Sequence, residues 1–274
     1  MSEKKKIRVY VAVPTTGTVV DGQEYVRRRL EKKYADEIEM VYPERCTQRI
    51  FHDFARNCHV RDFLASGCDI MWFLDSDIIP PDDVFDLITK HGDKWQAAGC
   101  PYPVFMTTSD KDVTKKVVLA IYKKSPDTGW LHAGRVPTAG GTEFVDGVAT
   151  GCIFLKREVF DGMEEPYFEF KYRKDDRYII EGEDMGFCMK LSKKGIQFFV
   201  DFNMVCQHWK RVDLMDVNDY ALEYAQNAIN AYDASIRPQI ENALSASKQL
   251  GYAKGFEAGQ KAGKPASTLW TPTG

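Results

Sequence analysis

The chain has 274 residues, of which 44% are hydrophobic and 12% aromatic, so it can bury a sizeable core. This composition excludes a disordered, collagen-like or low-complexity protein. With 37 basic and 40 acidic residues the net charge is −3, which argues against a generally basic nucleic-acid binder and leaves only a local basic patch open.

The N-terminus is charged and leads directly into an apolar run, so we expect no signal peptide. No stretch approaches the roughly 18 uncharged apolar residues of a membrane span. The seven cysteines, at positions 46, 58, 68, 100, 152, 188 and 206, include no pair with C-x-x-C spacing. We therefore expect a cytoplasmic protein without an integral membrane segment, whose cysteines are small core residues.

Short apolar runs bounded by turn residues predict strands at residues 7–13, 38–42, 69–74, 96–100, 117–122, 152–155 and 196–200. Helical spacing lies between them, at residues 24–34, 48–65, 80–92, 157–160 and 183–194. Alternating strands and helices predict an α/β protein with a mostly parallel central sheet covered on both faces, that is, a three-layer α/β/α sandwich.

Two details of this prediction concern helix ends and domain limits. Thr47 is the expected N-cap of the helix at 48–65, whose apolar face would include Phe51 and Phe54. After Asp213 the composition becomes rich in Ala, Asn and Tyr, and from Gly251 in Gly, Lys and Ser. We expect a catalytic domain at residues 1–212, followed at 213–274 by a helical appendage and a mobile tail.

The strongest local signal is Met71-Trp-Phe-Leu-Asp75-Ser-Asp77, where two carboxylates follow an apolar strand. Ligands of open α/β sheets bind beyond the carboxyl ends of the strands. Two carboxylates at such a point can share Mg²⁺ or Mn²⁺, which prefer oxygen ligands and often bridge to phosphates. A solvated turn is the simpler alternative, but the buried strand and the following Pro80-Pro81 favour a site.

Two further motifs depend on the first for their interpretation. Glu183 and Asp184 begin a predicted helix, where they either complement the helix dipole or present a general base. His208 ends another apolar stretch and is either a structural histidine or a third metal ligand. Small residues at Thr150 and Gly151 suggest either close approach of a ligand or of another strand, or simply packing in the core.

In this order the motifs resemble those of the GT-A fold glycosyltransferases, especially the family-2-like enzymes, over about residues 7–210. The matching segments are Val11-Ala-Val-Pro14-Thr-Thr-Gly17, Ala55-Arg56-Asn57, Asp75-Ser-Asp77, Thr150-Gly151, Glu183-Asp184 and His208. Gly186 departs from the pattern, because many relatives carry a carboxylate there.

The resemblance implies a metal-dependent transfer of sugar from a nucleotide-sugar, first of all a UDP-sugar, to an acceptor hydroxyl. The implied donor-binding residues are Pro14, Thr15, Thr16, Gly17, Arg56 and Asp75. The implied ligands of Mn²⁺ or Mg²⁺ are Asp75, Asp77 and His208. Asp184 would be the catalytic base, supported by Glu183, in an inverting displacement, whereas a retaining relative would use the same metal site without Asp184 as base. At a helix start, the dipole is expected to lower the pKa of Asp184.

Two other functions share some of these residues. In a haloacid-dehalogenase-like phosphatase, Asp75 would be the nucleophile and Asp77 the acid/base. A non-catalytic nucleotide-sugar-binding domain would keep the loop and Asp75 without a positioned base.

The acceptor is not specified by the motifs. Similar short glycosyltransferases occur in phages, where some modify hydroxymethylated DNA bases, and a base reached in this way would have to be flipped out of the duplex. The net charge does not favour a DNA acceptor, so a saccharide or another hydroxyl compound is the first expectation.

Overall fold

The computed structural model describes residues 5–15, 19–43, 51–107, 115–125, 129–132, 140–172 and 179–210. The chain divides into two units, Met1–Lys210 and Arg211–Gly274. In the second unit the described positions, which are scattered between 226 and 245, are all helical. None of the helices within these ranges has both the length and the apolar character needed to cross a membrane.

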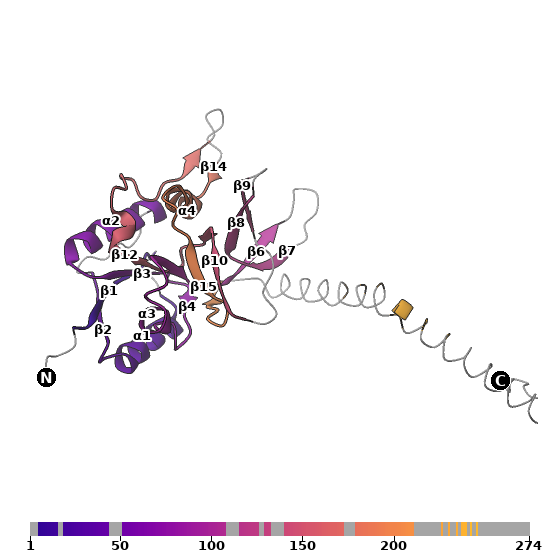
Figure 1. Ribbon diagram of the computed structural model, residues 1–274, viewed down its shortest axis with the longest axis horizontal. Helices are drawn as coiled ribbons and strands as arrows, with labels where there is room; N and C mark the ends of the chain where they lie inside the picture. The colour runs from indigo at the N-terminus through magenta and orange to yellow at the C-terminus, as the bar shows by residue number, and fades with distance from the viewer. Residues whose placement is uncertain are drawn as a thin grey trace, which may run out of the picture. The chain divides into compact units, whose positions relative to one another are not determined.

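A seven-stranded sheet forms the centre of the first unit (Figure 1). Its strands, in spatial order, are β10 (Thr142–Val145), β15 (Phe198–Asp201), β5 (Ala97–Gly99), β12 (Cys152–Lys156), β3 (Ile70–Leu74), β1 (Ile7–Ala12) and β2 (Ile38–Val41). The pairings give β2, β1, β3, β5 and β15 one direction, whereas β12 and β10 run the opposite way. The expected mostly parallel sheet is thus confirmed.

Helices cover both faces of this sheet, which gives the expected three-layer α/β/α arrangement. The helices are α1 (Asp21–Lys33), α2 (His52–Ser66), α3 (Asp86–Thr89) and α4 (Glu183–Lys193), with a 3₁₀ turn, η1, at Arg157–Phe160. Figure 1 shows α1 and α3 on one side and α2 and α4 on the other. Each side has its own apolar cluster, with Leu30 and Leu87 in one and Phe63 and Leu191 in the other.

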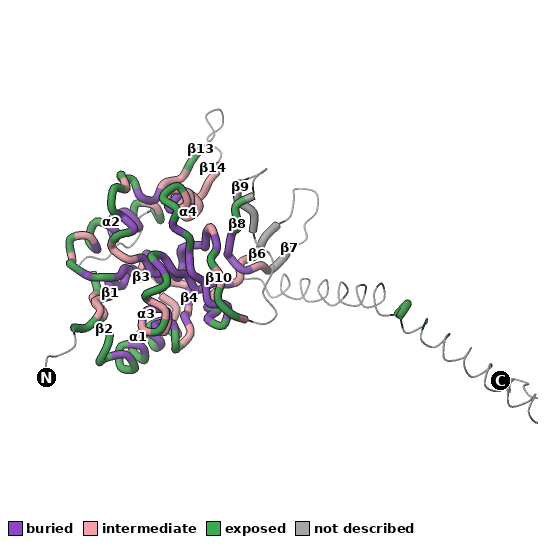
Figure 2. Tube along the Cα trace, viewed as in Figure 1, coloured by how far each residue is buried: buried purple, intermediate pink, exposed green. Residues whose placement is uncertain are grey.

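The alternation of side chains along the central strands explains these two clusters. Met71 and Phe73 of β3 face the cluster under α2 and α4, while Trp72 and Leu74 face the one under α1 and α3. All four side chains are fully buried, so β3 is apolar throughout. Figure 2 shows the sheet as the most continuously buried part of the described chain.

Smaller strands extend the fold beyond the central sheet. They are β4 (Ile78–Ile79), β6 (Pro103–Thr107), β7 (Lys115–Leu119), β8 (Ile121–Ser125), β9 (Gly129–His132), β11 (Gly147–Val148), β13 (Lys171–Tyr172), β14 (Ile179–Glu181) and β16 (Gln207–His208). The single strand expected at 117–122 is therefore two, β7 and β8. The helix expected at 80–92 is reduced to the short α3, with turns before it.

Helix α2 also differs from its prediction. It begins at His52, with Phe51 in an extended conformation before it, so the expected start at 48 is wrong; Thr47 lies outside the described residues. Phe51 and Phe54 are 83% and 53% exposed, and the buried face includes the polar Arg56 and Asn57 beside apolar residues. Asn57 explains why this face turns inward, because its side-chain amide donates to the carbonyl of Phe168 and accepts a hydrogen bond from the amide of the same residue.

Candidate active site

The predicted loop and the D-x-D segment leave the sheet at the same edge. Strands β1 and β3 are parallel neighbours, and Ala12 at the end of β1 is paired with Phe73 near the end of β3. Pro14 and Thr15 therefore follow β1 at the edge where Asp75 follows β3. Thr16 and Gly17, the other two expected loop residues, lie outside the described part of the chain.

The backbone of the turn that carries Asp75 and Asp77 is held by hydrogen bonds with Gly151, within the turn itself, and from the side chain of Gln23. The amide of Asp75 donates to the carbonyl of Gly151 at 2.8 Å, and the amide of Ile78 donates to the carbonyl of Asp75 at 3.0 Å. The side-chain amide of Gln23, fully buried on α1, donates to the carbonyls of Asp75 and Ile78 at 2.6 and 2.8 Å. The two carboxylates are thus presented from a rigid turn.

Arg56 joins α2 to this turn through a buried ion pair. Its Nη2 donates to both carboxylate oxygens of Asp75 at 3.0 Å, and its Nε lies 3.6 Å from Oε1 of Glu183. The guanidinium is 3% exposed and lies over the ring of Phe73. Burial opposes its charge, but the carboxylates of Asp75 and Glu183 outweigh burial and raise the pKa of Arg56.

Asp77 faces the last described segment of the first unit. Its Oδ2 lies 3.4 Å from Nε2 of His208 and forms an ion pair with Nζ of Lys210. The segment is held in place because β16 pairs with β4 and the amide of Trp209 donates to the carbonyl of Asp77 at 2.8 Å. Burial opposes ionisation, yet the hydrogen bonds from His208 and Lys210 lower the pKa of Asp77 to about 2.

The orientation of the His208 ring suits a cation ligand. Its Nδ1 lies 2.7 Å from the carbonyl oxygen of Pro103, and because a carbonyl only accepts, Nδ1 carries the proton. When the ring is also protonated on Nε2, that N–H donates to the carboxylate of Asp77, which is one of the hydrogen bonds that lower the pKa of Asp77. When the ring is neutral, Nε2 instead holds a lone pair that faces the same carboxylate oxygen. Two electron-rich atoms aimed at one another fit a bound cation, and here the ammonium of Lys210 supplies positive charge at Asp77.

Glu183 and Asp184 form the first turn of α4, as the sequence predicts. The carboxylate of Asp184 accepts a hydrogen bond from the amide of Met185 at 2.8 Å. Its pKa is nevertheless raised to about 6, chiefly by burial and then by the neighbouring charge of Glu183. The expectation that the helix dipole lowers this pKa is therefore wrong, because desolvation and like charge outweigh the dipole and Arg56.

The segment at Thr150 and Gly151 turns out to be approached by protein. A Cβ added to Gly151 would lie 2.6 Å from Oη of Tyr102, whose hydroxyl accepts a hydrogen bond from the Gly151 amide at 3.2 Å. Tyr102 is buried, and burial raises its pKa well above the usual range. The small residues therefore make room for an aromatic ring that packs behind the carboxylates.

The structure brings Arg56, Asp75, Glu183 and Asp184 into one electrostatic group and sets Asp77 with His208 beside it. Sequence reasoning missed Gln23, Tyr102 and Lys210. Gln23 lies within a charged, helical stretch that gives no sign of a buried amide. Lys210 could have been suspected, since it follows His208 by two residues and a lysine can pair with the carboxylate that such a histidine faces.

Comparison with known proteins gives loose likenesses of fold. The sequence matches no protein-family model and no curated protein. Among solved structures it is similar to A197 from STIV, with a TM-score of 0.47 and 17% identity over 74% of this chain and 86% of that one. It is also similar to GalNAc-T7 crystallised with UDP, GalNAc and Mn²⁺, with a TM-score of 0.45 and 14% identity over 76% of this chain. The match spans 44% of the GalNAc-T7 chain. At these scores neither likeness assigns a role to any residue here.

Proposed function

We propose that this protein is a metal-dependent glycosyltransferase that moves a sugar from a nucleotide-sugar donor to an acceptor hydroxyl. The observation that carries the proposal is the contrast between two carboxylates beside one Asp75–Arg56 pair. The pKa of Asp77 is held at about 2, while that of Asp184 is raised to about 6. Groups whose pKa values are pushed apart in this way suit different tasks, here binding a cation and taking a proton.

The cation-binding half consists of Asp77 and His208, with Asp75 next to them. Carboxylate oxygens and an imidazole nitrogen are suitable ligands for Mn²⁺, and oxygens for Mg²⁺. When bound, such an ion would neutralise the diphosphate of the departing nucleotide. Asp75, already paired with Arg56, would add its carboxylate on the donor side, while Pro14 to Gly17 would border the nucleotide. A UDP-sugar is the first donor to test.

The proton-accepting half consists of Asp184, supported by Glu183. A carboxylate with a pKa of about 6 is ionised at neutral pH and is more basic than an ordinary aspartate. Asp184 would take the proton of the acceptor hydroxyl as that oxygen attacks the anomeric carbon. This role belongs to an inverting displacement, in which the new bond forms on the face opposite to the leaving diphosphate.

The geometry favours this function over the two alternatives. A phosphatase would need Asp75 as its nucleophile, whereas the ion pair with the buried Arg56 stabilises the charge of this carboxylate and makes it a weaker nucleophile. A binding domain without catalysis has no use for a basic carboxylate held in a buried position at the cost of stability. The acceptor class is open to experiment: a saccharide is the first candidate, and a hydroxymethylated DNA base is the second. Action in the cytoplasm is part of the same proposal.

A thermal-shift panel tests the proposal. UDP-, GDP-, CMP- and dTDP-sugars are each added with and without Mn²⁺, and one nucleotide class is expected to raise Tm only when the metal is present. Asp77→Ala should abolish the metal-dependent part, whereas the exposed Asp161→Ala should keep it. A chain that ignores all four donors but hydrolyses a phosphate monoester would establish the phosphatase instead.

A further inference from the structure

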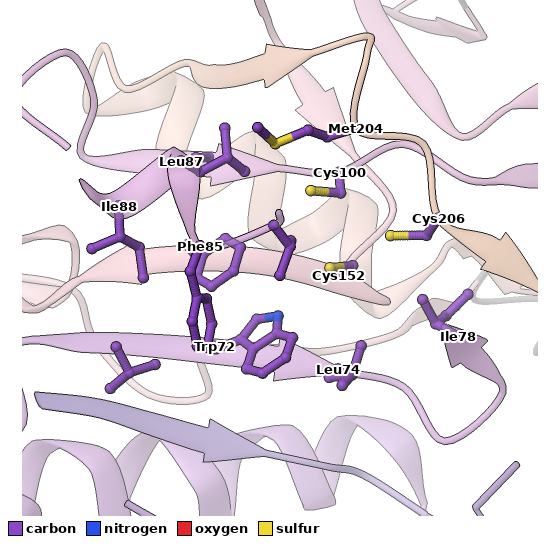
Figure 3. Packing of buried hydrophobic residues seen from close by; sticks show 14 of the residues in the cluster. Trp72, Leu74, Ile78, Phe85, Leu87, Ile88, Cys100, Cys152, Met204 and Cys206 are labelled. Atoms are coloured by element: carbon purple, nitrogen blue, oxygen red, sulfur yellow. The ribbon is translucent and has the colours of Figure 1, made fainter. Parts of the chain in front are cut away.

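Three cysteine sulfurs meet in the apolar core beneath the carboxyl edge of the sheet (Figure 3). Cys100 follows β5, Cys152 begins β12, and Cys206 immediately precedes β16. The three residues are 1%, 0% and 2% exposed. Cys100 and Cys152 are 52 positions apart in the sequence, and Cys152 and Cys206 are 54 apart, so the fold and not a C-x-x-C motif brings them together.

Backbone hydrogen bonds hold the three cysteines in this arrangement. The amide of Cys100 donates to the carbonyl of Cys152 at 3.0 Å, and the amide of Cys206 donates to the carbonyl of Pro101 at 2.9 Å. Each cysteine is thus tied to another, or to the neighbour of another, through the main chain. The main chain therefore fixes the positions from which the three short side chains converge.

The spacing of the sulfurs fits a shared metal ion. All three Sγ atoms lie within 4.8 Å of one another. Bonds of about 2.3 Å from a central ion to three sulfurs in a plane would separate the sulfurs by about 4.0 Å. Side-chain shifts of less than an ångström would therefore complete the coordination.

A buried hydrogen-bond donor beside the cluster gives an independent indication. The indole N–H of Trp72 is buried and has no partner within normal hydrogen-bond geometry among the described residues, although it lies close enough to Cys152 to favour the thiolate of that residue. Figure 3 shows the indole nitrogen on the edge of the ring nearest to Cys152. A neutral thiol is a weak acceptor, whereas a metal-bound thiolate would accept this hydrogen bond well. Cys188, another buried cysteine, instead donates its own thiol proton to the carbonyl of Val148.

We propose that Cys100, Cys152 and Cys206 form a binding site for one thiophilic d¹⁰ cation, Zn²⁺ or Cu⁺. Sulfur ligands select such ions over Mg²⁺ and Mn²⁺, so this site and the carboxylate site would sort metals by hardness. Binding would displace protons from the thiols as the metal–sulfur bonds form, with no change of oxidation state. Zn²⁺ leaves less net charge in the core, while Cu⁺ accepts three ligands without a fourth.

Metal competition on the full-length reduced protein tests this site. Zn²⁺ and Cu⁺ are titrated in separate arms against a chromophoric chelator specific for each ion, and one equivalent is expected to bind in one arm. Cys152→Ala should weaken that binding at least tenfold, whereas Cys188→Ala, a buried cysteine outside the cluster, should keep it. Equal binding by the two variants, or no chelator-resistant ion in the wild type, would overturn the proposal.

X-ray absorption of the loaded wild-type protein keeps the test independent of the variants. The expected spectrum has sulfur neighbours at about 2.3 Å from the ion. A first shell of nitrogen and oxygen would place the ion elsewhere and reject the cluster. Neither measurement uses donor or acceptor sugars, so the result does not depend on the glycosyltransferase proposal.

Discussion

Asp77 follows Asp75 by two residues, and Asp184 interacts with the charges of Asp75 and Arg56, yet the surroundings of Asp77 and Asp184 differ in kind. Asp77 has two nitrogen groups against it, from His208 and Lys210, and its pKa falls to about 2. Asp184 is buried next to Glu183, and its pKa rises to about 6. The same functional group is thus kept ionised at one end and made basic at the other. The difference comes from neighbours and solvent, and not from the residue type.

The carboxylates also differ in whether they have a cationic partner and in how easily that partner could be replaced. Asp75 already has its cation in the buried Arg56, with both oxygens engaged. The cation at Asp77 is an ammonium on a side chain that is 52% exposed, and a metal could replace it. Asp184 has no comparable cation at hydrogen-bond distance among the described residues. In the proposed function Asp77 would therefore exchange its ammonium partner for a metal cation, whereas Asp184 would exchange a proton.

The largest expected effect is on turnover when Asp184 loses its basicity. Asp184→Asn keeps the side-chain shape and should lower kcat by a factor of about 10² to 10⁴, with little change in donor affinity. The wild-type kcat should fall as the pH drops through about 6, because the base becomes protonated there. Steady-state kinetics against pH measure both.

Glu183→Gln is the matched control for that experiment. It removes a neighbouring charge and should reduce kcat less than Asp184→Asn does. Near-normal turnover of Asp184→Asn, or a product with the anomeric configuration of the donor, would remove the base from the mechanism.

Asp184→Asn should raise the stability of the folded protein, although it lowers turnover. Because the pKa of Asp184 is raised from 3.8 to about 6 on folding, ionisation costs the folded state about 3 kcal/mol above that pH. This part of the stability is complete below about pH 4 and is lost as the pH rises through about 6. Asp184→Asn should therefore be more stable than wild type at pH 8 and equal to it at pH 4. Urea unfolding at the two pH values measures the difference, and an equal gain at both would refute the assignment.

At the other end, His208→Ala should weaken metal-dependent donor binding by roughly 10- to 100-fold. The lone pair of Nε2 is then missing, while Asp77 remains. Calorimetric titration of Mn²⁺ in the presence of the donor measures the loss. Trp209→Ala, at an exposed neighbouring residue, serves as the control. Unchanged metal affinity in His208→Ala would leave this histidine a structural role only, at Pro103.

The smallest effect should have the opposite sign. Lys210→Met removes the ammonium that pairs with Asp77, so a metal no longer competes with it, and the Mn²⁺ affinity should rise by a few fold. The gain should shrink at high salt, because the side chain of Lys210 is half exposed. The same titration measures it. A fall in affinity would mean that Lys210 assists the site and does not compete for it.

Much of this fold follows from local sequence. Strand β3 is apolar on both faces because both faces are covered, and α4 ends where Gly195 adopts a φ of 73°. The buried face of α2 was not predictable from its apolar residues, because Asn57 and Arg56 turn inward to bind groups that are 111 and 19 positions away. The hydrophobic periodicity of one helix gives no information about polar partners that are so distant in the sequence.

The sequence predicts which elements carry the residues of the candidate site, but it does not predict the electrostatic effects of these residues on one another. Adjacent motif residues placed Asp75 and Asp77 at a strand end, and Asp184 at a helix start. The direction of the Asp184 pKa depends on burial and on charges from other segments, which the dipole argument ignores. Tyr102 and Gln23 act through contacts with backbone atoms, and those contacts exist only after folding.

The pairing of β16 with β4 has a consequence for the order in which the protein is made. His208 is translated 131 residues after Asp77, so the two sides of the cation-binding half cannot meet until nearly the whole first unit has left the ribosome. The contacts of Arg56 with Asp75, in contrast, span 19 residues and can form early. A nascent chain could thus form its donor-side ion pair long before it could bind a metal. Any metal-dependent activity would be delayed until the sheet that supports both halves is complete.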